Sequence, residues 1–211
     1  MDKLAELVDQ FRAEAGYPGG IRPRRDAERA ELALALSRDG FDDPDVQLLR
    51  RLAGTAYGRP GVQPGYYVLL RTDAGVAAVA AMFRYLLYGP GGVADRLDDC
   101  IHGEHRLPRV GEAMMVKALA VSDPDRWFPN YVTTGKVGKL AVLGVLGEQL
   151  PADLTRGAVA VASNDRIRQL LDQHFPGDPG GDRGVHLVAA APRKRPGNTA
   201  EAAPDTSRWH Q

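Results

Sequence analysis

The segment 107–111, Leu-Pro-Arg-Val-Gly, and the residues that follow it are best suited by type and spacing to bind an anion. Proline and glycine favour a sharp turn, and the pattern from Glu112 to Val121 predicts a helix that begins at once. The first N–H groups of a helix lack partners within the helix, and together with the helix dipole they attract phosphate. We therefore predict a turn and a helix that present backbone donors to a phosphate group.

This segment resembles the turn of a helix-hairpin-helix unit, which binds duplex DNA through its phosphates without reading sequence. One position departs from that pattern, because Arg109 stands where the family usually has glycine, and it either crowds the turn or adds a cation. Glu112, at the start of the helix, would oppose an anion. The alternative is a helical corner that only packs. The matching residues are Leu107, Pro108, Val110 and Gly111.

Lysines and aromatic side chains after the turn extend the candidate surface. Lys117 would partly offset Glu112, and the lysines of the segment 133–139, Thr-Thr-Gly-Lys-Val-Gly-Lys, would hold phosphates. Trp127 and Tyr131 either stack on a flipped or single-stranded base or fill the core, whereas Phe128 is expected in the core. The candidate nucleic-acid contacts are therefore Arg109, Gly111, Lys117, Lys136 and Lys139.

Enzymatic chemistry is not predicted from these residues. In the helix-hairpin-helix DNA glycosylases a catalytic aspartate follows the hairpin, but Asn130 and Tyr131 occupy the comparable stretch here. An amide cannot act as a base, so base excision is not expected. A degenerate glycosylase-like protein stays an alternative, with Asp123 and Asp125 as the only nearby carboxylates.

Nucleotide hydrolysis, metal binding and cofactor binding are not predicted either. The Gly-Lys segment lacks the spacing of a phosphate-binding loop, since Leu140 and not Ser or Thr follows Lys139. The triad Cys100, His102 and His105 lacks a second cluster at metal-site spacing, so we interpret it as a polar approach to the hairpin.

The composition restricts any DNA-binding site to a local patch of the surface. The 211 residues carry 27 Lys and Arg and 27 Asp and Glu, so the net charge is zero and any DNA site must be a patch. With one cysteine, no secretion signal and no apolar run long enough to span a bilayer, the sequence predicts a cytoplasmic protein without a membrane partner.

The elements that position the hairpin are predicted to be helices. The fold class is mostly α, a compact multi-helix domain with a helix-hairpin-helix-like corner and at most one or two short strands, of which 66–71 is the candidate. The domain covers 1–176, and the Gly-, Pro- and Arg-rich remainder, 177–211, is predicted to be a disordered tail. Predicted helices include 4–11, 26–37, a segment from 43 to 53, 76–87, 93–101, 112–121, 137–146 and 164–174.

Residues 85–179 resemble the domain that precedes the motor in McrB-like AAA+ ATPases of modification-dependent restriction systems. The segments that carry the resemblance are 106–113, 125–129, 135–139 and 162–166. The ATPase itself is absent, and the departure after Pro179 suggests a truncated or frameshifted gene. The resemblance implies a non-catalytic DNA-binding or adaptor domain with duplex DNA or a restriction-system protein as partner. The alternative is a protein-interaction module without DNA affinity, using the 76–87 helix or the aromatic patch.

Overall fold

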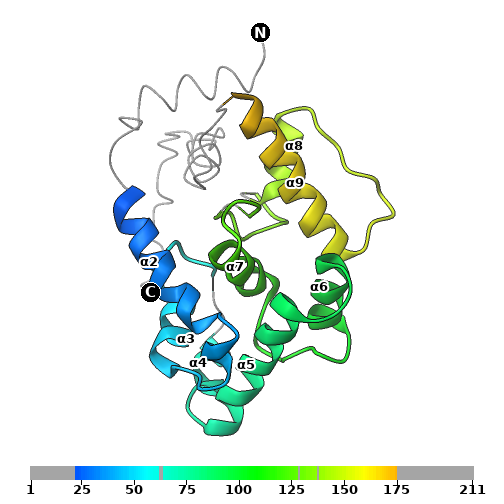
Figure 1. Cartoon of the computed structure of the whole chain (residues 1–211). Helices are drawn as coiled ribbons and strands as arrows, with labels where there is room; N and C mark the ends of the chain where they lie inside the picture. The colour runs from blue at the N-terminus through cyan, green and yellow to red at the C-terminus, as the bar shows by residue number, and fades with distance from the viewer. Residues whose placement is uncertain (1–21, 62–63, 128, 137, 175–211) are drawn as a thin grey trace, which may run out of the picture.

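The computed structural model describes residues 22–61, 64–127, 129–136 and 138–174. Within these ranges the chain forms eight α-helices and one 3₁₀ helix, with no strand, which confirms the predicted mostly α, multi-helix fold. The predicted helix at 4–11 and the predicted tail at 177–211 lie outside the described residues. The elements, labelled in Figure 1, are α2 (Arg22–Ala35), η1 (Asp39–Phe41), α3 (Val46–Ala53), α4 (Pro64–Leu69), α5 (Asp73–Tyr88), α6 (Val93–His102), α7 (Glu112–Ser122), α8 (Lys139–Val145) and α9 (Arg156–His174).

Helix α7 lies in the middle of the domain, with the other helices around it (Figure 1). It packs against α2, α3, α5 and α6, and all its residues from Met114 to Val121 are buried. Eight of the nine residues from Ala113 to Val121 are apolar, and a helix that is apolar on every side is stable only in the interior. The N-terminus of α7, at exposed Gly111, is therefore the part of this helix available to a ligand.

The longest apolar stripe of the sequence lies on α5 and is buried in the core. Thr72 caps α5 by accepting a hydrogen bond from the backbone N–H of Gly75 (3.1 Å). The stripe residues Val76, Val79, Ala80, Phe83 and Leu86 are all buried. The face proposed from sequence as a partner-binding surface thus packs inside this domain.

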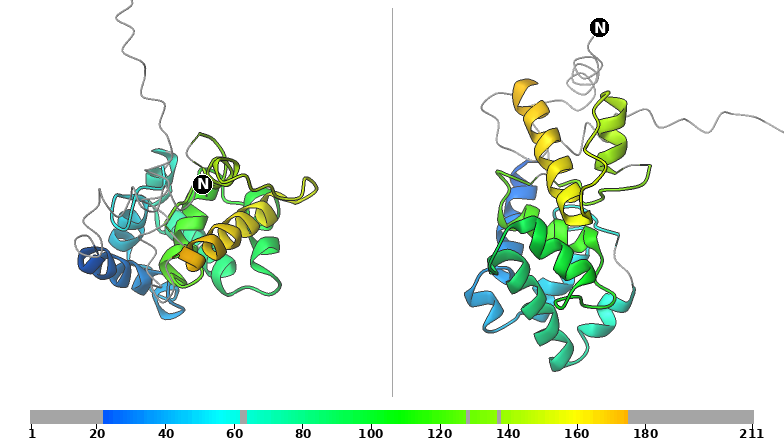
Figure 2. Two further views of the ribbon diagram at one scale, coloured as in Figure 1. Left: turned by 90° about the horizontal axis from the view of Figure 1, so that it is seen from above. Right: turned by 90° about the vertical axis from the view of Figure 1, so that its right-hand side faces the viewer.

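Helix α9 begins at Arg156, eight residues before the predicted start at 164, because its N-terminus is capped from another helix. Asp98 of α6 accepts a hydrogen bond from the Gly157 backbone N–H (2.7 Å) and another from the Thr155 hydroxyl. A Cβ at Gly157 would lie 2.2 Å from the Ala94 carbonyl oxygen, so glycine is needed for this close approach. This contact brings the first residue of α9 beside the end of α6, and Figure 2 shows α8 and α9 running together above the remaining helices.

The segment 66–71, left open between a strand and a helix start, is the end of α4 (to Leu69) and the turn that follows it. Tyr66 of this helix is fully buried, and its hydroxyl donates to the Leu49 carbonyl (3.0 Å), which ties α4 to α3. Within the described residues, no helix combines the length and the apolar character that a membrane span requires.

Candidate nucleic-acid interface

The loop between α6 and α7 has the helix ends that the sequence predicts. Helix α6 ends at His102, with the Gly103 N–H donating to the Asp99 carbonyl (2.8 Å), and α7 begins at Glu112 after an extended Gly111. No side chain caps the N-terminus of α7. The Met114 N–H already donates to the Gly111 carbonyl (3.0 Å), so the first-turn donors that could meet an anion are the N–H groups of Glu112 and Ala113.

The turn at 107–110 places its third residue in the left-handed region. The Val110 N–H donates to the Leu107 carbonyl (3.2 Å), and Arg109 has φ of 77°. Proline at the second position and positive φ at the third are the features of a type II turn, in which glycine is the favoured third residue. Arg109 therefore occupies a glycine position at a cost in backbone strain.

Replacing Arg109 by glycine is expected to raise the free energy of unfolding by about 0.5 kcal/mol. The left-handed conformation costs a residue with a Cβ about 1–2 kcal/mol, and the greater freedom of glycine in the unfolded chain cancels part of the gain. Urea denaturation with an unchanged m-value measures the difference. Arg106→Gly, at a position without positive φ, is the control and should lower stability; a loss in both variants would contradict the strain at Arg109.

A cavity of about 300 Å³ lies at this turn, between the end of α6, the loop and the start of α9. Its apolar side is formed by Ile101, Leu107, Pro108 and Val110. The polar residues that line it are His102, Arg106, Arg109, Glu112 and Arg156, and Gly111 completes it beside the N-terminus of α7. Three arginines thus line the cavity beside the N-terminus of α7, and the side-chain stem of Arg109 also lies against Gly65 of α4.

The carboxylate of Glu112, expected to oppose an anion, is paired. Its Oε2 accepts a hydrogen bond from Arg156 Nε (2.6 Å), and the glutamate side chain is only 8% exposed while that of Arg156 is 51% exposed. A paired carboxylate repels an approaching phosphate less than a free one, because the adjacent guanidinium cancels most of its field. Arg156 was not singled out from sequence, since it lies 44 residues from Glu112 and only the approach of α9 to α6 brings it here.

A group of polar side chains holds the loop in place. Asp99 of α6 accepts hydrogen bonds from His105 Nδ1 (2.6 Å) and from the Glu104 N–H (2.7 Å). The His105 ring also stacks on Tyr85 of α5, with centroids 3.5 Å apart. The hydrogen bond from His105 and a second one from the Tyr85 hydroxyl lower the pKa of Asp99. His105 thus anchors the hairpin loop to two helices, in line with the polar approach expected from sequence.

Lys117 does not lie on the surface. Its side chain is fully buried, and its Nζ donates to the carbonyl oxygens of Gly54 (3.2 Å), Ala56 (2.6 Å) and Gly58 (2.7 Å). Burial lowers the pKa of Lys117 to about 7, against the opposing effect of Glu28. The Lys117 amino group thus supplies hydrogen bonds to three carbonyl oxygens of one tight turn. The phosphate contact expected for Lys117 from the sequence is therefore wrong.

Lys139 and Trp127 are likewise buried together in the interior. Lys139 is fully buried, Trp127 is 1% exposed, and the Lys139 Nζ lies 5.1 Å from the centre of the indole. Burial lowers the pKa of Lys139 to about 7, although Glu112 and Asp165 raise it and the ring face also favours the cation. Neither side chain is accessible to a phosphate or a base in this structure, so the phosphate contact expected for Lys139 is wrong, and Trp127 takes the core position that was one of its two alternatives.

Tyr131 also belongs to the core. It is 3% exposed, and its hydroxyl donates to the carbonyl of Tyr57, in the same turn that Lys117 holds. Tyr131 therefore makes a structural contact in the core and is not accessible for stacking on a base. Of the remaining candidates, Arg109, Gly111 and Lys136 are exposed, whereas Phe128 lies outside the described residues.

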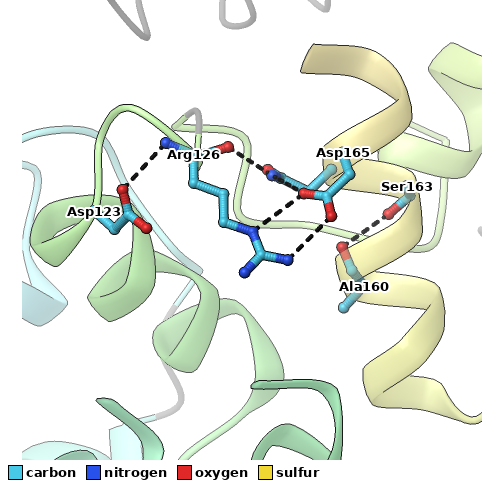
Figure 3. A network of polar contacts seen from close by, with 6 residues as sticks. Asp123, Arg126, Ala160, Ser163 and Asp165 are labelled. Carbon is cyan, nitrogen blue, oxygen red and sulfur yellow. Dashed lines mark hydrogen bonds and ion pairs between the residues drawn. The ribbon is translucent and has the colours of Figure 1, made fainter. Parts of the chain in front are cut away.

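A larger cavity, of about 750 Å³, lies beyond the other end of α7. Figure 3 shows its central ion pair, in which Arg126 Nη2 lies 3.0 Å from Asp165 Oδ2, while Asp123 accepts from the Arg126 backbone N–H (3.2 Å). Four aspartates and two arginines line this cavity, so it repels phosphates. Its lining residues are Asp123, Asp125, Arg126, Asp165, Arg168, Gln169, Asp172 and Gln173.

The carboxylates weighed for a glycosylase lie in this second cavity and not at the hairpin. Asp123 follows the last residue of α7, and an eleven-residue helix is about 16 Å long, so a helix length separates Asp123 from Gly111. Among the described residues, no three metal-ligating side chains gather, and Cys100 is buried. The hairpin cavity therefore supplies arginines and backbone donors, and the one carboxylate that lines it, Glu112, is paired with Arg156.

A comparison with protein-family models, curated protein sequences and solved structures finds no match to this chain.

Proposed function

We propose that this domain binds duplex DNA through its phosphates, using the hairpin between α6 and α7, and that it does so without catalysis. The observation that carries the proposal is the cavity at the N-terminus of α7, which Arg106, Arg109 and Arg156 line beside a helix end that no side chain caps. Arginine forks match the geometry of phosphate oxygens, and backbone N–H groups add donors that do not depend on sequence.

The proposed contacts differ from those expected on sequence alone. Arg109 and Gly111 are kept, Arg106 and Arg156 are added, and exposed Lys136 is a peripheral candidate. With Glu112 paired to Arg156, three arginines and one glutamate give the site a formal charge of +2, although the whole chain is neutral. This local excess is what a patch-type DNA site on a neutral protein requires.

The biological setting that we propose is an adaptor of a restriction-type ATPase. It rests on the resemblance of residues 85–179 to the domain that precedes the motor in McrB-like proteins. The protein-interaction alternative is less favoured, because the 76–87 stripe and the buried aromatic residues Trp127 and Tyr131 are used by the core.

A salt titration of DNA binding tests the proposal. Arg109→Gly and Arg156→Gln are each expected to weaken duplex binding about tenfold and to lower the slope of log K against log salt by about one. Arg51→Gln, on α3 in an exposed pair with Glu31, is the control that should leave binding unchanged. Wild-type protein that shows no salt-sensitive binding at low ionic strength would overturn the proposal.

The same assay with duplexes that do or do not contain 5-methylcytosine tests the restriction setting. A preference for the modified duplex supports the adaptor role. Equal affinity removes that role and leaves contact through phosphates alone, because phosphate contacts carry no base information.

A further inference from the structure

The hairpin cavity is lined by apolar residues and by three arginines. Its volume of about 300 Å³ is at the lower end of the range for small-ligand sites, about 300–1,000 Å³. Ile101, Leu107 and Val110 form the apolar side, while the arginines come from the loop and from α9. Such a lining suits one charged group joined to a less polar group, as in a single nucleotide unit.

The position of the cavity restricts how a DNA strand can use it. It is bounded by the end of α6, by the loop 106–111 and by Arg156 at the start of α9. A phosphodiester inside a strand continues on both sides, so only its phosphate can contact the cavity residues, whereas the end of a strand can also place its terminal sugar in the cavity. Val110, which lines the cavity, is buried, whereas Arg106 and Arg109 are exposed.

The charge of the lining also favours a terminal phosphate. A phosphomonoester carries about −1.5 to −2 at neutral pH, and a phosphodiester carries −1. The three arginines and Glu112 sum to +2, which matches the monoester more closely. A terminal phosphate also has three free oxygens to accept hydrogen bonds from guanidinium groups and from the N–H groups of α7.

We propose that this pocket binds the phosphomonoester at the end of a DNA strand, with the terminal sugar against Ile101, Leu107 and Val110. The inference rests on the proposed function, because it takes DNA as the ligand and the hairpin as the site. It adds that the protein distinguishes a phosphorylated strand end from a hydroxyl end and from continuous backbone.

Fluorescence anisotropy with one labelled duplex in three forms tests the inference: with a 5′-phosphate, with a 3′-phosphate and with hydroxyls at both ends. One phosphorylated form is expected to bind about tenfold more tightly than the hydroxyl form, the effect of one additional charge-assisted hydrogen bond. Arg156→Gln should abolish this preference, and Arg51→Gln, on the surface of α3, should retain it. Inorganic phosphate and a deoxymononucleotide serve as competitors.

The outcomes separate the inference from the function on which it rests. Salt-sensitive binding of equal strength for all three duplexes overturns the strand-end inference and leaves the phosphate-binding function intact. No binding of any duplex overturns both. Competition by inorganic phosphate at the concentration at which the phosphorylated duplex binds also overturns the inference, because the strand would then contribute nothing.

Discussion

Replacing Lys117 by methionine is expected to lower the free energy of unfolding by about 3 kcal/mol at pH 7. The methionine fills the same space, but the carbonyl oxygens of Gly54, Ala56 and Gly58 lose their shared donor. A buried acceptor left without a partner costs about 1–3 kcal/mol, and removal of the desolvated amine offsets only part of the loss. Chemical denaturation monitored by circular dichroism measures the change.

The matched control for this experiment is Lys136→Met. Lys136 is exposed, so its replacement should change the free energy of unfolding by no more than about 0.5 kcal/mol. If Lys117→Met were as stable as the wild type, the turn at 54–58 would not depend on the ammonium. In that case Lys117 would have to be reconsidered as a surface cation.

The free energy of unfolding is expected to rise by about 3 kcal/mol between pH 7 and pH 8.5. Burial lowers the pKa of Lys117 and of Lys139 to about 7, whereas an unfolded lysine keeps its proton to about pH 10.4. In this window the unfolded chain therefore binds more protons than the folded one, and stability increases as the pH rises. Above this pH window the Cys100 thiol has the opposite effect on stability. Burial raises the pKa of Cys100 to about 12, so the folded chain keeps this proton longer than the unfolded chain and stability falls as the pH rises.

The double variant Lys117→Met/Lys139→Met provides the control for the pH dependence. It lacks both shifted amines, so its stability should be nearly flat from pH 7 to pH 8.5. Urea midpoints at three pH values give the comparison. A wild-type stability that fell over this range would mean that the buried lysines stay charged when folded.

The helix ends around the hairpin could be predicted because their signals are local. Gly103 ends α6 and Gly111 precedes α7, as the sequence indicates, and the apolar stripe of α5 is buried as expected. The start of α9 could not be predicted, since its cap is the carboxylate of Asp98, 59 residues away from the Gly157 N–H. For the same reason Arg156 was missed as a member of the site.

The burial of Lys117 could have been predicted from its neighbours in the sequence. Its neighbours on both sides are apolar through Ala113–Val121, and a lysine inside such a run is buried with its helix. The charge of a side chain alone therefore does not identify a phosphate contact. Arg109, by contrast, is itself exposed in its turn, and it stays a candidate.

An NMR titration of the protein with a short DNA duplex tests the central claim most directly, because backbone amides report contact residue by residue. The largest shifts are expected on Gly111, Glu112 and Ala113 at the N-terminus of α7, together with Arg109 and Arg156, and added salt should reverse them. Shifts concentrated around Arg126 and Asp165, or no shift at Gly111 when the duplex binds, would contradict it.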